Sequence, residues 1–182
     1  MGDYGRVSLK RIAIDMDEVI ADTLEKFLTV CNTEIGLCLT KSDLTGRSLW
    51  DVIGKEHFPT LKGFVTEQDF FADLDIMPDS QDVIRRLMDH YEIFITSAAM
   101  EVPTSFAAKF DWLKLHFGFI PSSHIVFCGD KSILNADYLI DDNARHFERF
   151  RGEGILYSAP HNMRVEGYRR VHNWKEVEEL FH

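Results

Sequence analysis

Two carboxylates, one residue apart, follow a hydrophobic run near the start of the chain. In the stretch "RIAIDMDEVIAD" (residues 11–22), apolar residues lead into Asp15, and Asp17 comes after Met16. Carboxylates crowded at the buried end of a strand repel each other, and each loses hydration unless it finds a partner. We therefore expect a positively charged group next to Asp15 and Asp17.

Five further polar residues lie at or just after other apolar runs. Thr96 and Ser97 end the run "YEIFITS", Lys131 follows "HIVFCGD", and Asp141 and Asp142 end "DYLIDD". Since the carboxyl ends of parallel strands meet at one edge of a sheet, these side chains should share one crevice with the first two aspartates. The crevice would hold four carboxylates, two hydroxyls and one ammonium group.

Such a set of groups suits phosphoryl transfer. Carboxylates without Cys or His beside them favour a hard cation, and we expect Mg²⁺. With a metal ion balancing the charge, one carboxylate can attack phosphorus and a second can protonate the leaving oxygen. Hydroxyl and ammonium groups can hold the phosphoryl oxygens. Lys131 is the only basic residue that we place at these strand ends, so we expect a phosphate counter-charge that contributes little to the core.

The elements that would position these residues alternate between strands and helices. Five apolar runs are rich in Ile, Val, Phe or Tyr without clean polar alternation, which is typical of strands buried on both faces of a parallel sheet. Helical spacing occupies residues 79–90 and 104–117 and a final helix that starts after Asn173. Residues 159–170 indicate a polar loop. The fold class is therefore α/β, with a parallel sheet flanked by helices. The runs are "RIAIDMD", "YEIFITS", "HIVFCGD", "DYLIDD" and "GILYSA".

One segment interrupts this alternation. After the first strand and a helix at about residues 22–36, residues 37–77 contain no convincing buried strand. We interpret residues 23–77 as a small, mostly helical cap and residues 1–22 and 78–182 as the α/β core. An insertion at this point lies over the carboxyl ends of the strands, where open α/β sheets bind ligands.

The bulk composition limits the partners. The chain has 182 residues and a net charge of -10, which disfavours a nucleic-acid polymer or an anionic membrane as partner. No apolar run approaches the length needed to cross a bilayer, and residues 1–10 lack the apolar core of a signal peptide. Three cysteines, odd in number and without zinc spacing, indicate reduced thiols. We expect a cytoplasmic protein; the oligomeric state does not follow from the sequence.

The motifs resemble those of a known superfamily. "DMDEVIAD", "FITSAA", "DKS" and "YLIDDN", in this order, are similar to the four motifs of the haloacid dehalogenase (HAD) superfamily of phosphatases. Within it, "DMDEVIADT", "FFADLDIMPD", "TSAAM" and "DK…ADYLIDD" resemble the 5'(3')-deoxyribonucleotidase family. The resemblance covers nearly the whole chain. It implies a Rossmann-like core with a helical cap after the first strand, and a Mg²⁺-dependent nucleotidase that forms an aspartyl phosphate.

The same resemblance implies the catalytic roles. Asp15 would be the nucleophile and Asp17 the general acid and base. Thr96, together with Ser97, would bind the phosphate, and Lys131 would neutralise it.

The resemblance also implies a metal site. The Asp15 side chain, the backbone carbonyl of Asp17 and Asp142 would hold Mg²⁺, and Asp141 would support this site from behind.

The substrate pocket departs from the animal members of the family. Thr23 stands where they carry an aromatic residue. Trp50 is the remaining candidate for stacking on a base, although an aromatic residue of a small cap more often belongs to its interior. We therefore expect a nucleoside monophosphate as substrate, with modest selectivity among the bases.

Other functions remain open at this stage. A phosphatase for sugar phosphates or another small metabolite needs the same catalytic set. A dehalogenase needs no metal and no second acid, so Asp17 and Asp142 argue against it. A phospho-accepting signalling module also combines aspartates, a hydroxyl residue and a lysine, but its acidic pair precedes its acceptor. Catalytic turnover of a phosphomonoester would separate the enzyme from such a module.

Overall fold

The computed structural model describes residues 9–182. Residues 1–8, most of the stretch in which no signal-peptide core is expected, lie outside the described part. Among the residues described, no helix is both long enough and apolar enough to cross a membrane.

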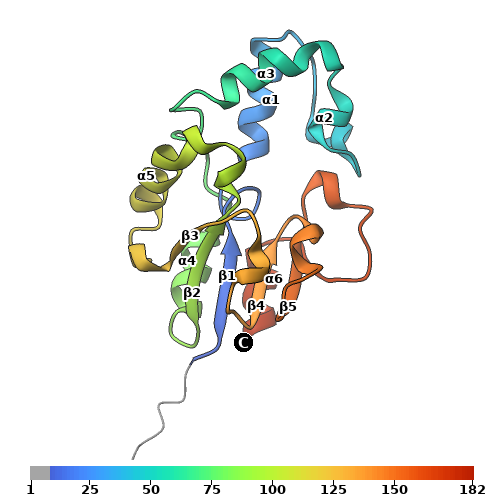
Figure 1. Cartoon of the computed structure of the whole chain (residues 1–182). Coiled ribbons are helices and arrows are strands. Elements are labelled where there is room, and N and C mark those ends of the chain that lie inside the picture. Colours follow the sequence, from blue (N-terminus) through green and yellow to red (C-terminus); the bar gives the residue numbers. More distant parts are fainter. Residues whose placement is uncertain (1–8) are drawn as a thin grey trace, which may run out of the picture.

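A six-stranded parallel sheet forms the centre of the fold, in the order β3-β2-β1-β4-β5-β6 (Figure 1). The five runs expected to be strands all contribute to it, which confirms the α/β class. The strands are β1 (Arg11–Asp15), β2 (Glu92–Ser97), β3 (Ile125–Phe127), β4 (Tyr138–Asp141), β5 (Glu153–Tyr157) and β6 (Arg169–Val171).

The sixth strand corrects the prediction of a polar loop over residues 159–170. β6 pairs in parallel with β5, with Arg169 opposite Ile155 and Val171 opposite Tyr157. Two of its three residues are arginines, so it carries no apolar run. An edge strand can be this short and polar because one side of it faces solvent.

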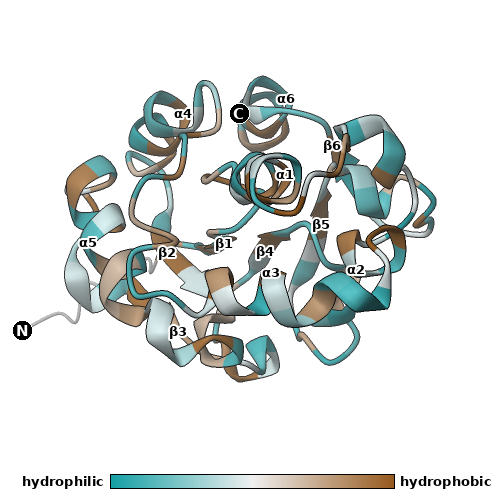
Figure 2. Ribbon diagram, turned by 90° about the horizontal axis from the view of Figure 1, so that it is seen from above, coloured by the Kyte–Doolittle hydropathy of each residue, from teal (hydrophilic) through white to brown (hydrophobic). Residues whose placement is uncertain are grey.

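The helices begin and end close to the expected positions. Asp22 caps the first helix by accepting a hydrogen bond from the Glu25 backbone N–H. Asn173 caps the last helix in the same way, by accepting a hydrogen bond from the Glu176 backbone N–H. Figure 2 shows α4 and α6 side by side over one face of the sheet. The helices are α1 (Thr23–Thr33), α2 (Leu49–Val52), α3 (Phe58–Val65), α4 (Ser80–Leu87), α5 (Phe106–His116) and α6 (Trp174–Phe181).

The core lies on both faces of the sheet. Ile12 and Ile14 of β1 pack into the larger cluster, which includes Ile84 of α4 and Val177 of α6. Ala13, between them in sequence, belongs to a second cluster on the opposite face. Burial of successive residues on alternate faces explains why the β1 sequence is apolar without alternation.

The segment after β1 forms a helical roof. We use this name for residues 23–65, which comprise α1, α2, α3 and the turns between them. The roof lies above the carboxyl ends of the strands (Figure 1). Residues 37–75, all of them described, contain no strand. Ile76 then makes a single bridge to Ala21, which ties the return of the chain to the loop after β1.

Candidate active site

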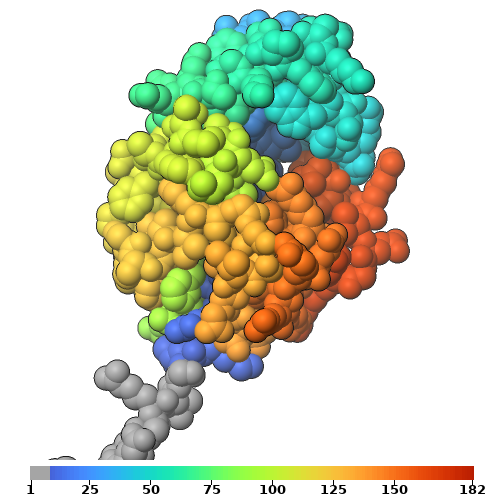
Figure 3. Space-filling view, viewed as in Figure 1, coloured from blue at the N-terminus to red at the C-terminus, as the bar shows by residue number. Residues whose placement is uncertain are grey.

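A cavity of about 640 Å³ lies between the helical roof and the carboxyl edge of the sheet. The space-filling view shows the hollow between these two parts (Figure 3). Its carboxylates all come from the sheet side, and the roof contributes mainly apolar side chains. The expected site residues among the lining are Asp15, Asp17, Asp141, Asp142, Thr23 and Trp50.

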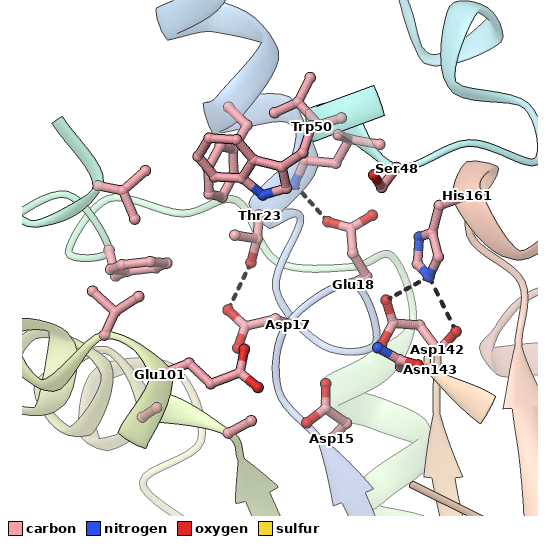
Figure 4. Close-up of a pocket in the computed structure, with 18 of the residues that line it drawn as sticks. Asp15, Asp17, Glu18, Thr23, Ser48, Trp50, Glu101, Asp142, Asn143 and His161 are labelled. Carbon is pink, nitrogen blue, oxygen red and sulfur yellow. Dashed lines mark hydrogen bonds and ion pairs between the residues drawn. The ribbon is translucent and has the colours of Figure 1, made fainter. Parts of the chain in front are cut away.

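Asp15 lies at the end of β1 on the cavity floor (Figure 4). Its neighbour in the sheet register is Thr96 of β2, and only 5% of the residue is exposed. Burial raises the pKa of Asp15 to about 7, although the ammonium group of Lys131 acts in the opposite direction. The carboxylate is therefore confined, oriented by one cation and open to the cavity.

Lys131 lies underneath the carboxylates. Its Nζ donates hydrogen bonds to Oδ1 of Asp15 and, at 2.6 Å, to Oδ2 of Asp141. Burial opposes the charge, yet these two carboxylates raise the pKa of Lys131 above its usual range. The side chain is 1% exposed and does not line the cavity. The expectation that Lys131 contributes little to the core is therefore wrong, because it holds two buried carboxylates together.

We expect Lys131→Met to lower the free energy of unfolding as well as activity. Removing one partner of a buried ion pair costs about 3–5 kcal/mol, since the other charge stays buried. Without Lys131, the folded-state pKa of Asp15 rises further above its unfolded value of 3.8. An acidic group whose pKa is higher in the folded than in the unfolded state makes the fold less stable as pH rises. The free energy of unfolding of the variant should therefore be lower at about pH 8 than at about pH 5.

Urea unfolding in metal-free buffer measures this effect, and Lys26→Met is the matched control. Lys26 pairs with Asp73 at the surface, 2.6 Å apart, where an ion pair contributes at most about 1 kcal/mol. The structural role of Lys131 would be contradicted if Lys131→Met lowered the free energy of unfolding no more than Lys26→Met does, and by the same amount at every pH.

Lys109 is a second cation that sequence reasoning missed. Its Nζ lies 2.6 Å from Oδ2 of Asp17 and 3.3 Å from the hydroxyl of Ser97, and the residue is only 4% exposed. Asp17 also accepts hydrogen bonds from Ser97 at 3.2 Å and from Thr23 at 3.0 Å. Although burial acts to raise the pKa of Asp17, Lys109 and these hydroxyls lower it.

The position of Lys109 explains why it was missed. It lies on α5, 92 residues from its partner, inside a segment whose pattern indicates an ordinary amphipathic helix. A lysine among Phe106, Ala108 and Phe110 is the only local signal, and nothing in it points to Asp17. The prediction that Lys131 is the only basic residue at the strand ends is therefore wrong.

The two carboxylates after β4 have different surroundings. Both oxygens of Asp141 receive hydrogen bonds, from Lys131 and from the Asn143 backbone N–H at 2.8 Å. Asp142 is partly open to the cavity, and burial raises its pKa. Carboxylate oxygens of Asp15, Asp141 and Asp142 all lie within 4.8 Å of one another. This oxygen-only set fits a hard divalent cation.

Glu18 adds an unexpected carboxylate to the cavity. Its backbone has φ 61°, in the left-handed region that favours glycine, and its Oε1 accepts a hydrogen bond of 2.5 Å from the Leu24 N–H. Burial raises its pKa to about 8. Figure 4 shows the side chain pointing upward between Thr23 and Asp142. The sequence carries no signal for this, because a glutamate is an unusual choice for that backbone conformation.

The expected phosphate-binding hydroxyls lie below the cavity surface. Thr96 is 1% exposed, and its hydroxyl is 3.7 Å from Sγ of Cys128. Ser97 is fully buried against Asp17 and Lys109. Neither side chain lines the cavity. Ser97 thus fixes the second aspartate, and phosphate binding by the two residues stays a prediction.

Both expected pocket residues line the cavity. Thr23 donates its hydroxyl hydrogen to Asp17, so its observed contact is with a catalytic candidate. Trp50 is 39% exposed and packs edge-on against Phe58, with ring centroids 5.2 Å apart. Its indole faces the cavity from above (Figure 4). Trp50 is therefore a wall residue and does not belong to the interior of the roof.

Comparisons with known proteins agree with this geometry. The profile of the family described as "5' nucleotidase, deoxy (Pyrimidine), cytosolic type C protein" (NT5C) matches residues 9–182. The chain belongs to this family. A Bacillus subtilis 5'(3')-deoxyribonucleotidase is 39% identical over 171 residues, which cover 93% of this chain and 96% of the relative. A Staphylococcus aureus protein with the same name, given provisionally, is 45% identical over 172 residues, which cover 94% of this chain and 95% of the relative.

Solved structures show the same fold in the HAD superfamily. A HAD-like hydrolase of Streptococcus pneumoniae has a TM-score of 0.62 and 13% identity, over 97% of this chain and all of that one. A Bacillus subtilis HAD hydrolase that was solved with magnesium has a TM-score of 0.61 and 11% identity, over 96% and 99% of the two chains. The expected HAD-like fold and the family resemblance are therefore confirmed.

Proposed function

We propose that this chain is a Mg²⁺-dependent phosphomonoesterase that hydrolyses nucleoside monophosphates through a phosphoryl group on Asp15. The observation that carries the proposal is the pairing of each candidate catalytic carboxylate with its own cation. Lys131 contacts Asp15, and Lys109 contacts Asp17, at the floor of one cavity. The family relatives named as 5'(3')-deoxyribonucleotidases support the nucleotide as substrate.

Asp15 is the proposed nucleophile. One of its oxygens is held by Lys131, which leaves the other to attack phosphorus from the cavity side. The new bond joins a carboxylate oxygen to phosphorus as the bond from phosphorus to the leaving oxygen breaks, giving an acyl phosphate and a nucleoside. Water then attacks phosphorus, which releases phosphate and restores Asp15.

Asp17 is the proposed general acid and base. Lys109 keeps its pKa low, whereas a phosphate dianion bound beside it raises that pKa again, so a proton becomes available when substrate is present. Asp17 gives this proton to the leaving oxygen and later takes one from the attacking water. The contacts with Thr23, Ser97 and Lys109 hold its carboxylate in one orientation for both steps.

The donor set supports a magnesium site. Asp15 and Asp142 would bind the ion with their side chains and Asp17 with its backbone carbonyl. Asp141 would support the site, since both of its oxygens already accept hydrogen bonds. When bound, Mg²⁺ supplies positive charge that screens the phosphate from the carboxylates. Thr96 and Ser97 would then contribute to the phosphate site.

The roof would determine what is bound beyond the phosphate. Phe27, Leu49 and Trp50 give it an apolar, partly aromatic surface that fits a nucleobase better than a sugar. We regard residues 23–77 as a cap that covers the leaving group. With a net charge of -10, the protein suits a free mononucleotide in the cytoplasm more than a nucleic-acid polymer.

Trp50→Ala tests the role of the roof. Stacking on an aromatic side chain contributes about 1–3 kcal/mol per base, so KM for a deoxynucleoside monophosphate should rise about tenfold or more. KM for glycerol phosphate, which has no ring, should stay within about twofold. Tyr168→Ala is the control, because Tyr168 is also 39% exposed but does not line the cavity. An equal rise for both substrates would refute stacking at Trp50.

A substrate panel tests the proposed function. Phosphate release should be measured with Mg²⁺ on 2'-deoxyribonucleoside and ribonucleoside monophosphates, on sugar phosphates and on p-nitrophenyl phosphate. We expect multiple turnovers and the highest kcat/KM among the nucleotides. A sugar phosphate as best substrate would favour the metabolite phosphatase, and a single stoichiometric phosphorylation would favour a signalling module.

A further inference from the structure

Asn162 connects the ends of two strands beneath the candidate metal site. It ends a short 3-10 turn after β5 and is 1% exposed. Its side-chain amide nitrogen donates one hydrogen bond to the backbone carbonyl of Asp142, at 2.7 Å, and another to that of Tyr157, at 2.8 Å. The carbonyl of a proposed magnesium ligand is thus held by a side chain from the neighbouring loop.

The orientation of Asn162 is itself fixed. Its Oδ1 accepts hydrogen bonds from Nη1 of Arg170, at 2.8 Å, and from the Ala159 N–H, at 3.2 Å. Arg170 also donates to the backbone carbonyls of Asn162, at 3.0 Å, and Val165, at 2.6 Å. The amide therefore uses both of its N–H donors and both acceptor sites of its oxygen. A buried network with every group satisfied is rigid and permits one arrangement.

This network acts on the backbone of Asp142, which has few other restraints. Asp142 follows the last residue of β4, so the sheet no longer holds it. Within residues 9–182, His161 is the other polar side chain at Asp142, with Nε2 3.3 Å from the backbone carbonyl and 3.5 Å from the carboxylate. Holding the carbonyl restrains the Cα from which the Asp142 carboxylate projects into the cavity.

We propose that Asn162, held in place by Arg170, is a positioning residue for the magnesium ligand Asp142. The inference rests on the proposed function, because it takes Asp142 as a ligand of Mg²⁺. Residues that orient metal ligands typically change metal affinity about 10–100-fold when they are replaced. Arg170 makes no contact with Asp142 and must act through Asn162.

Calorimetric titration of the metal-free full chain with Mg²⁺ tests the proposal without any measurement of activity. We expect Asn162→Ala to weaken Mg²⁺ binding about tenfold or more, and we expect Arg170→Met to weaken it as well. The double variant should bind no more weakly than Asn162→Ala, since effects that pass through one contact do not add. If Asn162→Ala does not fold, Arg170→Met decides the question.

Asn32→Ala is the matched control. The Asn32 side chain also holds a loop through its backbone: it donates to the Leu39 carbonyl at 2.9 Å and accepts from the Leu39 N–H at 2.7 Å. Asn32 does not line the cavity. Its replacement should leave Mg²⁺ affinity within about twofold of wild type. A folded Asn162→Ala variant with wild-type affinity, or an equal loss in Asn32→Ala, would overturn the positioning role. A wild-type chain that binds no Mg²⁺ would overturn the metal site together with this inference.

Discussion

Asp15→Asn is expected to reduce kcat by about 10⁴-fold or more, with little change in the free energy of unfolding. An amide oxygen cannot attack phosphorus, and removal of a covalent nucleophile typically has an effect of this size. The fold should tolerate the change because the amide has the same shape as the carboxylate. Its oxygen can still accept from Lys131, and Lys131 keeps its contact with Asp141.

The measurement is phosphate release from the best nucleotide of the panel, with Asp111→Asn as control. Asp111 is an exposed carboxylate on α5, so its amide variant should retain wild-type turnover. Circular dichroism and urea unfolding would show that both variants are folded. Turnover by Asp15→Asn within tenfold of wild type would place the nucleophile on another residue.

Removal of divalent cations is expected to reduce turnover at least about a hundredfold, and added Mg²⁺ should restore it. Carboxylate oxygens of Asp15, Asp141 and Asp142 lie within 4.8 Å of one another, and Asp17 and Glu18 line the same cavity. Two lysines contact this cluster, which leaves an excess of negative charge facing an anionic substrate. A bound cation removes that repulsion.

Dialysis against a chelator followed by titration with Mg²⁺ measures this dependence. A control incubation with the chelator already saturated with Ca²⁺ separates chelation from direct inhibition by the chelator. Unchanged turnover after complete metal removal would contradict the assignment of a magnesium site to these carboxylates.

The sheet was predictable wherever a strand is buried on both faces. The runs that became β1, β2, β4 and β5 have apolar centres without polar alternation, and this pattern needs no knowledge of tertiary contacts. β6 was not predictable, because an edge strand with Arg169 and Arg170 has no apolar pattern. Its arginines have roles that appear only in three dimensions, as the contact between Arg170 and Asn162 shows.

Part of the candidate site was also predictable from the sequence. Asp15 and Asp141 end strands, and Asp17 and Asp142 follow within two residues, so parallel topology alone brings the four aspartates together. Lys109 could not be found, since its helix position becomes meaningful only when α5 packs against the sheet edge.

Burial and backbone conformation account for two further gaps. Lys131 was placed near the right carboxylates, but its depth below the cavity depends on packing that no local pattern encodes. Glu18 enters the cavity because its backbone takes a left-handed conformation, which its residue type does not favour.

The central claim, that Asp15 accepts the phosphoryl group, is tested most directly by trapping the intermediate. Wild-type protein should be mixed with Mg²⁺ and a deoxynucleoside monophosphate radiolabelled at phosphorus, quenched with acid within milliseconds and digested. We expect a labelled peptide whose phosphoryl group maps to Asp15 and is released by hydroxylamine, as an acyl phosphate should be. Label on a different residue, or rapid product formation without any labelled peptide, would contradict the account.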